Sequence, residues 1–308
     1  MDKNAKIYVA GSRGLVGSAI IRKLKALGYL YTIEKTSAEL DLRCQVAVDK
    51  FFKQQQPQYV FLAAAKVGGI FANSTYPAEF IYDNLTIETN IIQAAHKYKV
   101  KKILFLGSSC IYPKCAPQPL KEEYLLTGAL EETNEAYAIA KIAGIKMCQA
   151  YQRQYGDNFI SVMPTNLYGI NDNFDLQNSH VMPALIRKIH EAKLAGEAKV
   201  TVWGSGTPRR EFLYVDDLAD ACCFLMNYYN ESDIINIGTG QDVTICELVT
   251  LIAEIIGYYG KINYDRTKPD GTPVKRLDVN KLRSLGWSAN TSLRSGIEKT
   301  YEWYLNNL

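Results

Sequence analysis

The sequence contains no long apolar run and no basic tract, and each absence removes a class of protein. Its longest apolar runs, such as YVFLAAA at 59–65, are far too short to cross a bilayer, so a membrane-spanning helix is not expected. The 35 basic and 32 acidic residues are mixed along the chain and leave a net charge of only +3. This charge pattern predicts neither nucleic acid nor a membrane surface as a partner.

Cysteine and histidine are also scarce, and neither is arranged as a metal site. The seven cysteines are odd in number, contain no C-x-x-C pair and form no dense framework, which is typical of free thiols in a reducing compartment. The first residues, MDKNAKIYVAG, lead into an expected strand without a signal-like apolar region. We therefore expect a cytoplasmic protein without bound metal.

What the sequence does contain is a regular alternation of short apolar runs and amphipathic stretches. The segments between the runs carry apolar residues at three- and four-residue spacing, as helices do. The alternation predicts an α/β fold with a Rossmann-like, doubly wound parallel sheet. The expected strands are 6–11, 29–35, 59–65, 101–109 and 159–165.

The pattern becomes irregular after Thr165, which predicts a smaller second lobe. We expect one domain at 1–165, with returning segments around 211–240, and an interleaved C-terminal lobe at 166–308. After Thr165 we expect helices near 180–195, from Asp216, near 244–257 and near 292–307, and strands at KVTVW and DIINIG.

A glycine-rich turn follows the first expected strand. Gly11, Gly14 and Gly17 stand at G-x-x-G-x-x-G spacing and lead directly into a helix. Glycines let backbone N–H groups approach a pyrophosphate, and a helix N-terminus favours its negative charge, so the turn predicts a dinucleotide site. At the end of the second strand, Glu34 and Lys35 point to opposite faces by alternation. Arg13 in the turn adds a second cation, which favours NADP over NAD.

Tyr137 and Lys141 lie four residues apart on a strongly helical run, so their side chains share one face. An ammonium beside a phenol favours the phenolate, so we expect Lys141 to lower the pKa of Tyr137 and make it a usable proton donor. The same spacing recurs at 31/35, 98/102 and 264/268, but in a strand, at the start of a strand and in an expected loop, respectively. Only the 137/141 pair follows a parallel strand that ends in hydroxyls, at Ser108.

Together the glycine turn, Ser108, the Tyr137 helix and PTNLYG at 164–169 resemble the extended short-chain dehydrogenase/reductase family, over essentially the whole chain. The resemblance implies that Ser108 and Tyr137 hold and protonate a reacting carbonyl oxygen and that Lys141 binds the nicotinamide ribose. Dehydratases of the family have an acid pair where this chain has Ser109-Cys110. Ser109 has no assigned role.

Several longer stretches resemble family members that epimerise and reduce GDP-4-keto-6-deoxy-D-mannose with NADPH. They are AAAKVGGI (63–70), LGSSCIYPK (106–114), PTNLYG, NSHVMPALIRK (178–188) and VWGSGTPRREFLYVDD (202–217). The resemblance implies Cys110 as base and His180 as acid for inversion at carbons 3 and 5. A thiol with a pKa near ~8.5 and an imidazole with a pKa near ~6.5 can both exchange protons near neutrality.

Other site residues follow from the same resemblance. Besides Gly11, Arg13, Gly14, Gly17, Lys35, Lys141 and His180, the cofactor set comprises Leu15, Val16, Asp41, Leu42, Ala64, Pro164, Asn166 and Leu167. The GDP-sugar set comprises Lys188, Trp203, Arg210, Asp270 and Arg283, and the sequence leaves open whether Arg187 or Lys188 faces the pocket. Relatives often have an arginine where this chain has Ser37, which weakens the preference for NADP.

The oligomeric state and two other functions stay open at this point. The resemblance implies a homodimer formed through the long helices near 78–98 and 134–155, but an apolar face alone does not distinguish a dimer face from a core face. One alternative function is a sugar-nucleotide 4-epimerase or reductase that uses NAD. The other is a dinucleotide-sensing protein without catalysis.

Overall fold

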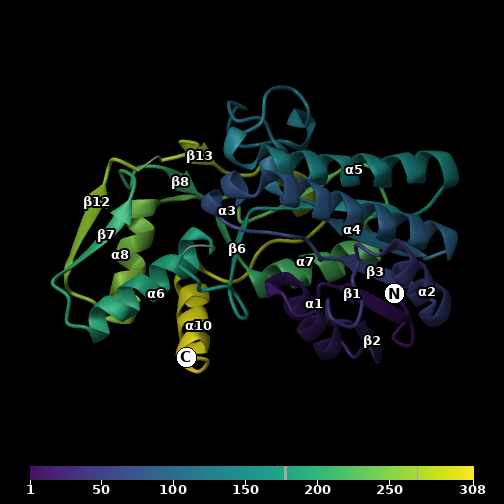
Figure 1. Ribbon diagram of the computed structural model, residues 1–308, viewed down its shortest axis with the longest axis horizontal. Helices are drawn as coiled ribbons and strands as arrows, with labels where there is room; N and C mark the ends of the chain where they lie inside the picture. Colours follow the sequence, from purple (N-terminus) through teal and green to yellow (C-terminus); the bar gives the residue numbers. More distant parts are fainter. Residues whose placement is uncertain (177–178, 269) are drawn as a thin grey trace.

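The computed structural model describes residues 1–176, 179–268 and 270–308. Asn178, which opens the stretch 178–188, therefore lies outside the described residues. The molecule is elongated, with a layered α/β part that holds the N-terminus and a smaller part that holds α6, α8 and the C-terminus (Figure 1).

A six-stranded sheet of parallel strands forms the larger part. Its order is β10-β5-β4-β3-β1-β2, and each strand pairs in parallel with its neighbours. The strands are short and almost wholly buried in the centre of the sheet, as expected of a sheet covered on both faces. Their bounds are β1 Lys6–Ala10, β2 Tyr31–Glu34, β3 Tyr59–Leu62, β4 Lys102–Leu106, β5 Phe159–Pro164 and β10 Ile235–Ile237.

Helices cover both faces of this sheet, which confirms the doubly wound α/β fold (Figure 1). On one face α1 (Leu15–Ala26) and α7 (Val215–Tyr228) pack over a core that includes Ile20 and Leu218. On the other, α2 (Gln45–Gln55), α4 (Pro77–Lys97) and α5 (Glu135–Tyr155) bury a second core that includes Phe52, Ile91 and Ile145. Helix α4 lies along α5 in this second layer.

The smaller part has a core of its own, built from α6, α8, α10 and short strands, with Ile186, Val200 and Ile252 at its centre. Because β10 joins the first sheet, the chain crosses between the two parts more than once. The remaining elements are α3 Ile70–Thr75, β6 Asn166–Tyr168, α6 Val181–Leu194, β7 Lys199–Trp203, β8 Arg209–Arg210, β9 Phe212–Tyr214, β11 Val243–Thr244, α8 Ile245–Ile256, β12 Lys261–Asp265, β13 Val274–Lys275, α9 Asn280–Ser284 and α10 Leu293–Leu305, with single 3-10 turns at Ser109–Ile111, Glu122–Tyr124 and Glu132–Asn134.

The expected helices and strands of the first half are confirmed, whereas the second half contains strands that the sequence did not predict. The expected loop around Tyr264 is wrong, because this residue lies in β12, which pairs in parallel with β7. The segment KINYD alternates polar with apolar residues, as a half-buried strand does, so the sequence held a signal for this strand that was missed. No helix in the described part of the chain is long and apolar enough to cross a membrane.

Candidate active site

The candidate site begins where β4 ends at the carboxyl edge of the sheet. Ser108 is in extended conformation, and its hydroxyl oxygen accepts a hydrogen bond of 3.3 Å from the backbone N–H of Cys110. This bond caps the 3-10 turn Ser109–Ile111 and holds the thiol of Cys110 directly beyond the serine. Ser108 is half-buried and Cys110 is buried. The turn therefore presents a hydroxyl and a thiol together, as the sequence predicted.

Tyr137 lies on the first turn of α5, close to Ser108 and Cys110. Its ring packs edge-on against Phe80 at 6.4 Å between centroids. Burial raises the pKa of Tyr137 well above its usual value of 10; the negative charges of Cys110 and Glu88 add to this effect, and a hydrogen bond with Ser108 opposes it. The expectation that Lys141 lowers the pKa of Tyr137 is wrong for this state of the protein.

Lys141 explains the difference, because its ammonium faces a carboxylate. Its Nζ lies 2.9 Å from Oε1 of Glu88 on α4, and the two side chains are only 2% and 1% exposed. The same Nζ lies 5.8 Å from the centre of the Tyr137 ring. The positive charge is thus balanced by Glu88 and does not act on the phenol alone.

His180 is the residue immediately before α6 and is open to solvent. Protein around its ring and the positive charge of Lys275 lower the pKa of His180. Burial raises the pKa of Cys110, and the positive charges of Lys275 and Lys141 oppose that rise. Cys110 and His180 therefore come under the influence of the same lysine.

Lys275 is a functional candidate that the sequence did not reveal. It lies on β13, directly beside Arg210 of β8 in the parallel register. Burial lowers the pKa of Lys275, the negative charge of Cys110 raises it and the positive charge of Arg210 lowers it again. Its strand has only two residues and follows a Pro- and Gly-containing segment, so no periodicity distinguished this lysine from its neighbours.

The glycine turn has the geometry that a pyrophosphate requires. Gly11 has a φ of +81°, and a Cβ there would lie 2.8 Å from the backbone nitrogen of Ala64, while a Cβ on Gly17 would lie 2.1 Å from the carbonyl oxygen of Gly11. Because the N-cap residue of α1 is Gly14, no N-cap side chain occupies the first N–H groups of the helix, and the first turn has no acidic residue. The turn therefore leaves helix N–H groups open to an anion and fits a dinucleotide.

The charges after β2 are arranged on two sides. Glu34 faces α1 and lies 3.3 Å from Nζ of Lys25, whereas Lys35 lies 3.2 Å from Oε1 of Glu39 in the following turn. Arg13 is exposed. Glu34 and Lys35 are thus both paired, whereas Arg13, within the glycine turn itself, has no ion pair in the part of the chain that the structure describes.

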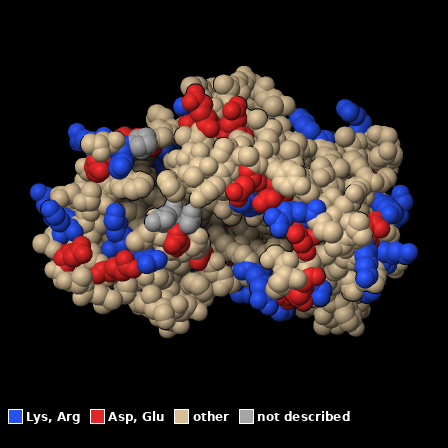
Figure 2. Space-filling model, in the orientation of Figure 1, with Lys and Arg blue, Asp and Glu red and all other residues tan. Residues whose placement is uncertain are grey.

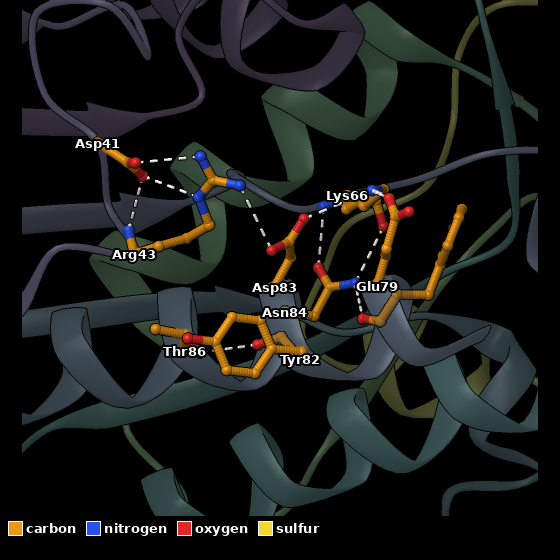
Figure 3. A network of polar contacts seen from close by, with 9 residues as sticks. Asp41, Arg43, Lys66, Glu79, Tyr82, Asp83, Asn84 and Thr86 are labelled. Atoms are coloured by element: carbon orange, nitrogen blue, oxygen red, sulfur yellow. Dashed lines mark hydrogen bonds and ion pairs between the residues drawn. The ribbon is translucent and has the colours of Figure 1, made fainter. Parts of the chain in front are cut away.

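Side chains of α4 contact the loops that carry the predicted cofactor residues Asp41, Leu42 and Ala64. Figure 3 shows the contacts that Asp83 and Asn84 of α4 make with Arg43 and Lys66 of these loops. Asp41 forms a forked ion pair with Arg43, which also lies 3.5 Å from Asp83. Asn90 donates to the carbonyl of Leu42 at 2.9 Å. Asn84 fastens the backbone of Lys66, two residues after Ala64, through bonds of 2.9 and 3.0 Å. Helix α4 thus fixes the loops after β2 and β3.

The remaining predicted cofactor residues flank the glycine turn and the end of β5. Leu15 and Val16 open α1, and Pro164 is the last residue of β5. Asn166, on β6, donates a 2.7 Å hydrogen bond from Nδ2 to the carbonyl of Glu211, and Leu167 pairs with Leu213 of β9. These residues lie along the carboxyl edge of the sheet, where ligands of such folds bind.

Three of the predicted substrate residues lie close together in the smaller part. The backbone carbonyl of Asp270 accepts a 3.3 Å hydrogen bond from Arg210, and the Asp270 carboxylate accepts two bonds of 2.7 Å from Ser205. Trp203 is exposed, two residues before Ser205. Figure 2 shows a hollow between the two parts of the molecule on this face, with basic and acidic side chains mixed around it.

The other predicted cations have their own partners. Lys188 donates to the carbonyl of Thr201 at 2.6 Å, while Arg187 bonds Glu191 and the carbonyl of Phe174. Arg283 donates to the carbonyl of Thr239 and lines a cavity of about 320 Å³ that also reaches Arg210. None of Ser108, Cys110, Tyr137 and His180 lines this cavity. Arg283 thus shares a cavity with Arg210, apart from the residues around Ser108.

The fold and this site together define a dinucleotide-dependent enzyme of the short-chain type, and the chain belongs to the NAD dependent epimerase/dehydratase family, whose model matches residues 7–238. It is 62% identical to "GDP-L-fucose synthase 1" of Arabidopsis thaliana over 307 residues, which cover 100% of this chain and 95% of the relative.

Two solved structures extend the comparison. A GDP-6-OMe-4-keto-L-xylo-heptose reductase from C. jejuni is 39% identical, with a TM-score of 0.96 over 100% of this chain and 99% of the other. A GDP-L-fucose synthetase from Naegleria fowleri bound to NADP is 29% identical, with a TM-score of 0.92 over 100% of this chain and 96% of the other.

Proposed function

We propose that this protein is an NADPH-dependent enzyme that epimerises GDP-4-keto-6-deoxy-D-mannose at carbons 3 and 5 and reduces its 4-keto group, giving GDP-L-fucose. One observation carries the proposal: the positive charge of Lys275 acts on both Cys110 and His180, and Cys110 acts in turn on Tyr137, which hydrogen-bonds with Ser108. The 62% identity to the Arabidopsis synthase supports the choice of substrate.

Ser108 and Tyr137 would bind the carbonyl oxygen of the sugar. Hydrogen bonds to that oxygen stabilise the enolate that forms when a proton leaves the neighbouring carbon. Cys110 and His180 would exchange the protons at carbons 3 and 5, one on each face, and Tyr137 would donate the proton that completes reduction. Lys275 and Arg210 supply positive charge suited to the diphosphate of the substrate.

The cofactor set fits the residues that surround the glycine turn. The turn formed by Gly11, Gly14 and Gly17 would bind the pyrophosphate through its backbone N–H groups. Arg13 and Lys35 would face the 2′-phosphate. Bound NADPH supplies the hydride for carbon 4. The Naegleria synthetase, which was solved bound to NADP, supports this cofactor.

Deuterated water tests the proposal directly. The protein is incubated with GDP-4-keto-6-deoxy-D-mannose, first without and then with NADPH. We expect deuterium at carbons 3 and 5 in both cases, and oxidation of NADPH with formation of GDP-L-fucose in the second. Reduction without deuterium at either carbon would refute the epimerase part of the proposal.

A second candidate is a 4-keto reductase that does not epimerise. The C. jejuni reductase favours it, because that protein matches the whole chain at a TM-score of 0.96. Under this alternative the Cys110 thiol has no chemical task, so Cys110→Ser would leave turnover nearly intact. The same substitution should slow deuterium incorporation about 10²-fold if the protein is an epimerase–reductase.

We also propose that two copies associate through α4 and α5 and that the enzyme works in the cytoplasm. Tyr82 on α4 is 66% exposed, and Ile139 and Tyr155 on α5 are 42% and 53% exposed, which leaves apolar surface on adjacent helices. All seven cysteines are free thiols, which supports a reducing compartment. Sedimentation of the parent and of a Tyr82→Glu, Ile139→Glu variant tests the dimer, which should dissociate in the variant.

A further inference from the structure

The turn after β2 contains a carboxylate that the proposed chemistry does not use. One oxygen of Glu39 accepts a hydrogen bond of 2.9 Å from the backbone N–H of Thr36 and another of 2.9 Å from the Thr36 hydroxyl. Its other oxygen lies 3.2 Å from Nζ of Lys35. Because the Thr36 backbone, the Thr36 hydroxyl and Lys35 all bind this carboxylate, the pKa of Glu39 is lowered to about 2, and the group is charged at neutral pH.

The donors that surround Glu39 are suited to a phosphate. Proteins bind phosphate oxygens with ammonium groups, backbone N–H groups and hydroxyls, and all three kinds of donor meet here. They stand at the carboxyl end of β2, whose last residue, Glu34, pairs with Val9 of β1, two residues before Gly11. The end of the second strand is where a Rossmann fold holds the 2′-position of the adenosine ribose. Glu39 therefore occupies, with its own carboxylate, donors that a 2′-phosphate could use.

The neighbouring acidic residues have cationic partners of their own. Glu34 lies 3.3 Å from Nζ of Lys25 on α1, and Asp41 lies 3.0 Å from Nε of Arg43. The first turn of α1 has no acidic residue. The negative charge that a 2′-phosphate would meet at this turn is thus the charge of Glu39.

Thr36 and Glu39 also form a reciprocal pair that shapes the turn. The backbone N–H of Glu39 donates to the Thr36 hydroxyl at 3.2 Å, while the Glu39 carboxylate accepts from the Thr36 backbone, which is the pattern of a capping box. Glutamine can replace glutamate in a capping box. The shape of the turn therefore explains an acceptor at position 39 and leaves its negative charge unexplained.

We propose that Glu39 is a specificity-determining residue, whose carboxylate competes with the 2′-phosphate for Lys35 and Thr36 and so lowers the preference of the protein for NADPH over NADH. The inference rests on the proposed function only in placing the 2′-phosphate beside Arg13 and Lys35. The 2′-phosphate has the same sign of charge as Glu39 and needs the same donors. The 2′-hydroxyl of NADH is neutral and can donate a hydrogen bond to a carboxylate at this place.

The Glu39→Gln variant tests this proposal, because it removes the charge and keeps the capping box. By calorimetric titration at low ionic strength, NADP⁺ should bind about tenfold more tightly to the variant than to the parent, since a like charge is gone and Lys35 is released. The Kd of NAD⁺ should change less than about threefold, as for the loss of one hydrogen bond. Glu247→Gln is the matched control, since Glu247 forms the same box with Thr244 and lies 3.9 Å from Nη1 of Arg209. It should change neither Kd.

Two smaller ligands locate the effect at the adenosine end of the cofactor. Adenosine 2′,5′-bisphosphate and adenosine 5′-phosphate differ only in the 2′-phosphate, so only the first should bind more tightly to Glu39→Gln than to the parent. The gain should shrink at an ionic strength of about 1 M, where the Debye length is only about 3 Å, because Glu39 is exposed.

The outcomes separate the role of Glu39 from the rest of the proposed function. Unchanged binding of NADP⁺ by Glu39→Gln, or an equal gain for NAD⁺, overturns the role of Glu39 and leaves the proposed reaction standing. The titrations need no sugar, so a parent that binds NADP⁺ but does not turn over the keto sugar refutes the reaction, and the comparison with Glu39→Gln still decides the role of Glu39. A parent that binds neither cofactor overturns both.

Discussion

Two buried lysines lie near opposite ends of β4, Lys102 within the strand and Lys141 on α5, and they are used differently. At the amino end of β4, Lys102 is 3% exposed and donates to the carbonyls of Leu225 and Tyr229 and to Oδ1 of Asn230. At the carboxyl end, Lys141 is 2% exposed and faces Glu88. The first lysine meets only neutral oxygens, whereas the second meets a charge.

The difference follows from what lies at each end of the sheet. Helix α7 has no basic residue in its last turn, and the ammonium of Lys102 supplies the positive charge that its C-terminal carbonyls favour. The carboxyl end holds Ser108, Cys110 and Tyr137, whose protonation states matter for chemistry. Lys102 should therefore affect the stability of the fold, whereas Lys141 should affect the protonation of its neighbours. Four predictions test this division.

The largest effect should come from Tyr137→Phe. The substitution removes the proposed proton donor at the carboxyl end and leaves the packing of the ring against Phe80. Hydride transfer to the keto sugar should fall about 10³-fold, within the range that general acid catalysis contributes. NADPH oxidation under saturating substrate measures the rate, and thermal unfolding controls for the fold. A loss of less than tenfold would place the proton donor elsewhere.

Cys110→Ser should have the next largest effect, and it should be selective. A hydroxyl in place of the thiol is a far weaker acid, so proton exchange at carbons 3 and 5 should fall about 10²-fold. Reduction of a substrate that has already been epimerised should continue, because Ser108 and Tyr137 are unchanged. Deuterium incorporation and NADPH oxidation are measured on the same samples. Equal losses in both would contradict separate roles for the thiol and the phenol.

Lys102→Met tests the amino end, where the effect should appear in stability. Burial lowers the pKa of Lys102 from 10.5 to about 8. Between these values the unfolded chain binds more protons than the folded one, so the free energy of unfolding of the parent should rise with pH. The rise should amount to about 1 to 3 kcal/mol and be absent from the variant. Urea unfolding at several pH values measures it, and parallel pH curves would show that Lys102 stays charged when buried.

The sequence predicted the residues at the carboxyl end of the sheet better than Glu88 on α4 and Lys275 on β13, which surround them. Ser108, Tyr137 and Lys141 could be placed together because parallel strands end at one edge and a helix follows. Glu88 left a usable signal, since a charged residue stands on the face of α4 that otherwise buries Phe80, Ile91 and Ile92. The signal was missed because its partner lies on another helix.

Lys275 and the short strands left no such signal. A strand of two residues has no period, and β13 is positioned by its pairing with β8, more than sixty residues earlier. The predicted effect of Lys141 on Tyr137 failed for a related reason: spacing within one helix gave the distance between the two side chains, but the counter-ion came from α4. Local patterns predict which residues share a face of a helix or strand, whereas contacts between segments far apart in the sequence determine the pKa values of those residues.

The smallest effect concerns the pH dependence of proton exchange, which compares two groups within the carboxyl end. Burial raises the pKa of Cys110 above its ordinary value of 9.0, and the protein around the His180 ring together with Lys275 lowers the pKa of His180 below 6.5. Around neutral pH the site therefore holds a protonated thiol and a neutral imidazole. A thiolate with an imidazolium carries the same number of protons, because one proton has only moved from the sulfur to the ring. The populations of the two forms therefore keep a constant ratio as the pH changes.

Exchange at carbons 3 and 5 should consequently be nearly independent of pH between the two limits. It should fall at acid pH, below the lowered pKa of His180, where the pair gains a second proton, and at alkaline pH, above the raised pKa of Cys110, where it loses its only one. Deuterium incorporation measured without NADPH from about pH 5 to about pH 10 gives this profile. Lys275→Met removes a charge that lowers both pKa values, so the whole plateau should move to higher pH with its width retained. A shift of one limb alone would mean that Lys275 acts on only one of the two groups.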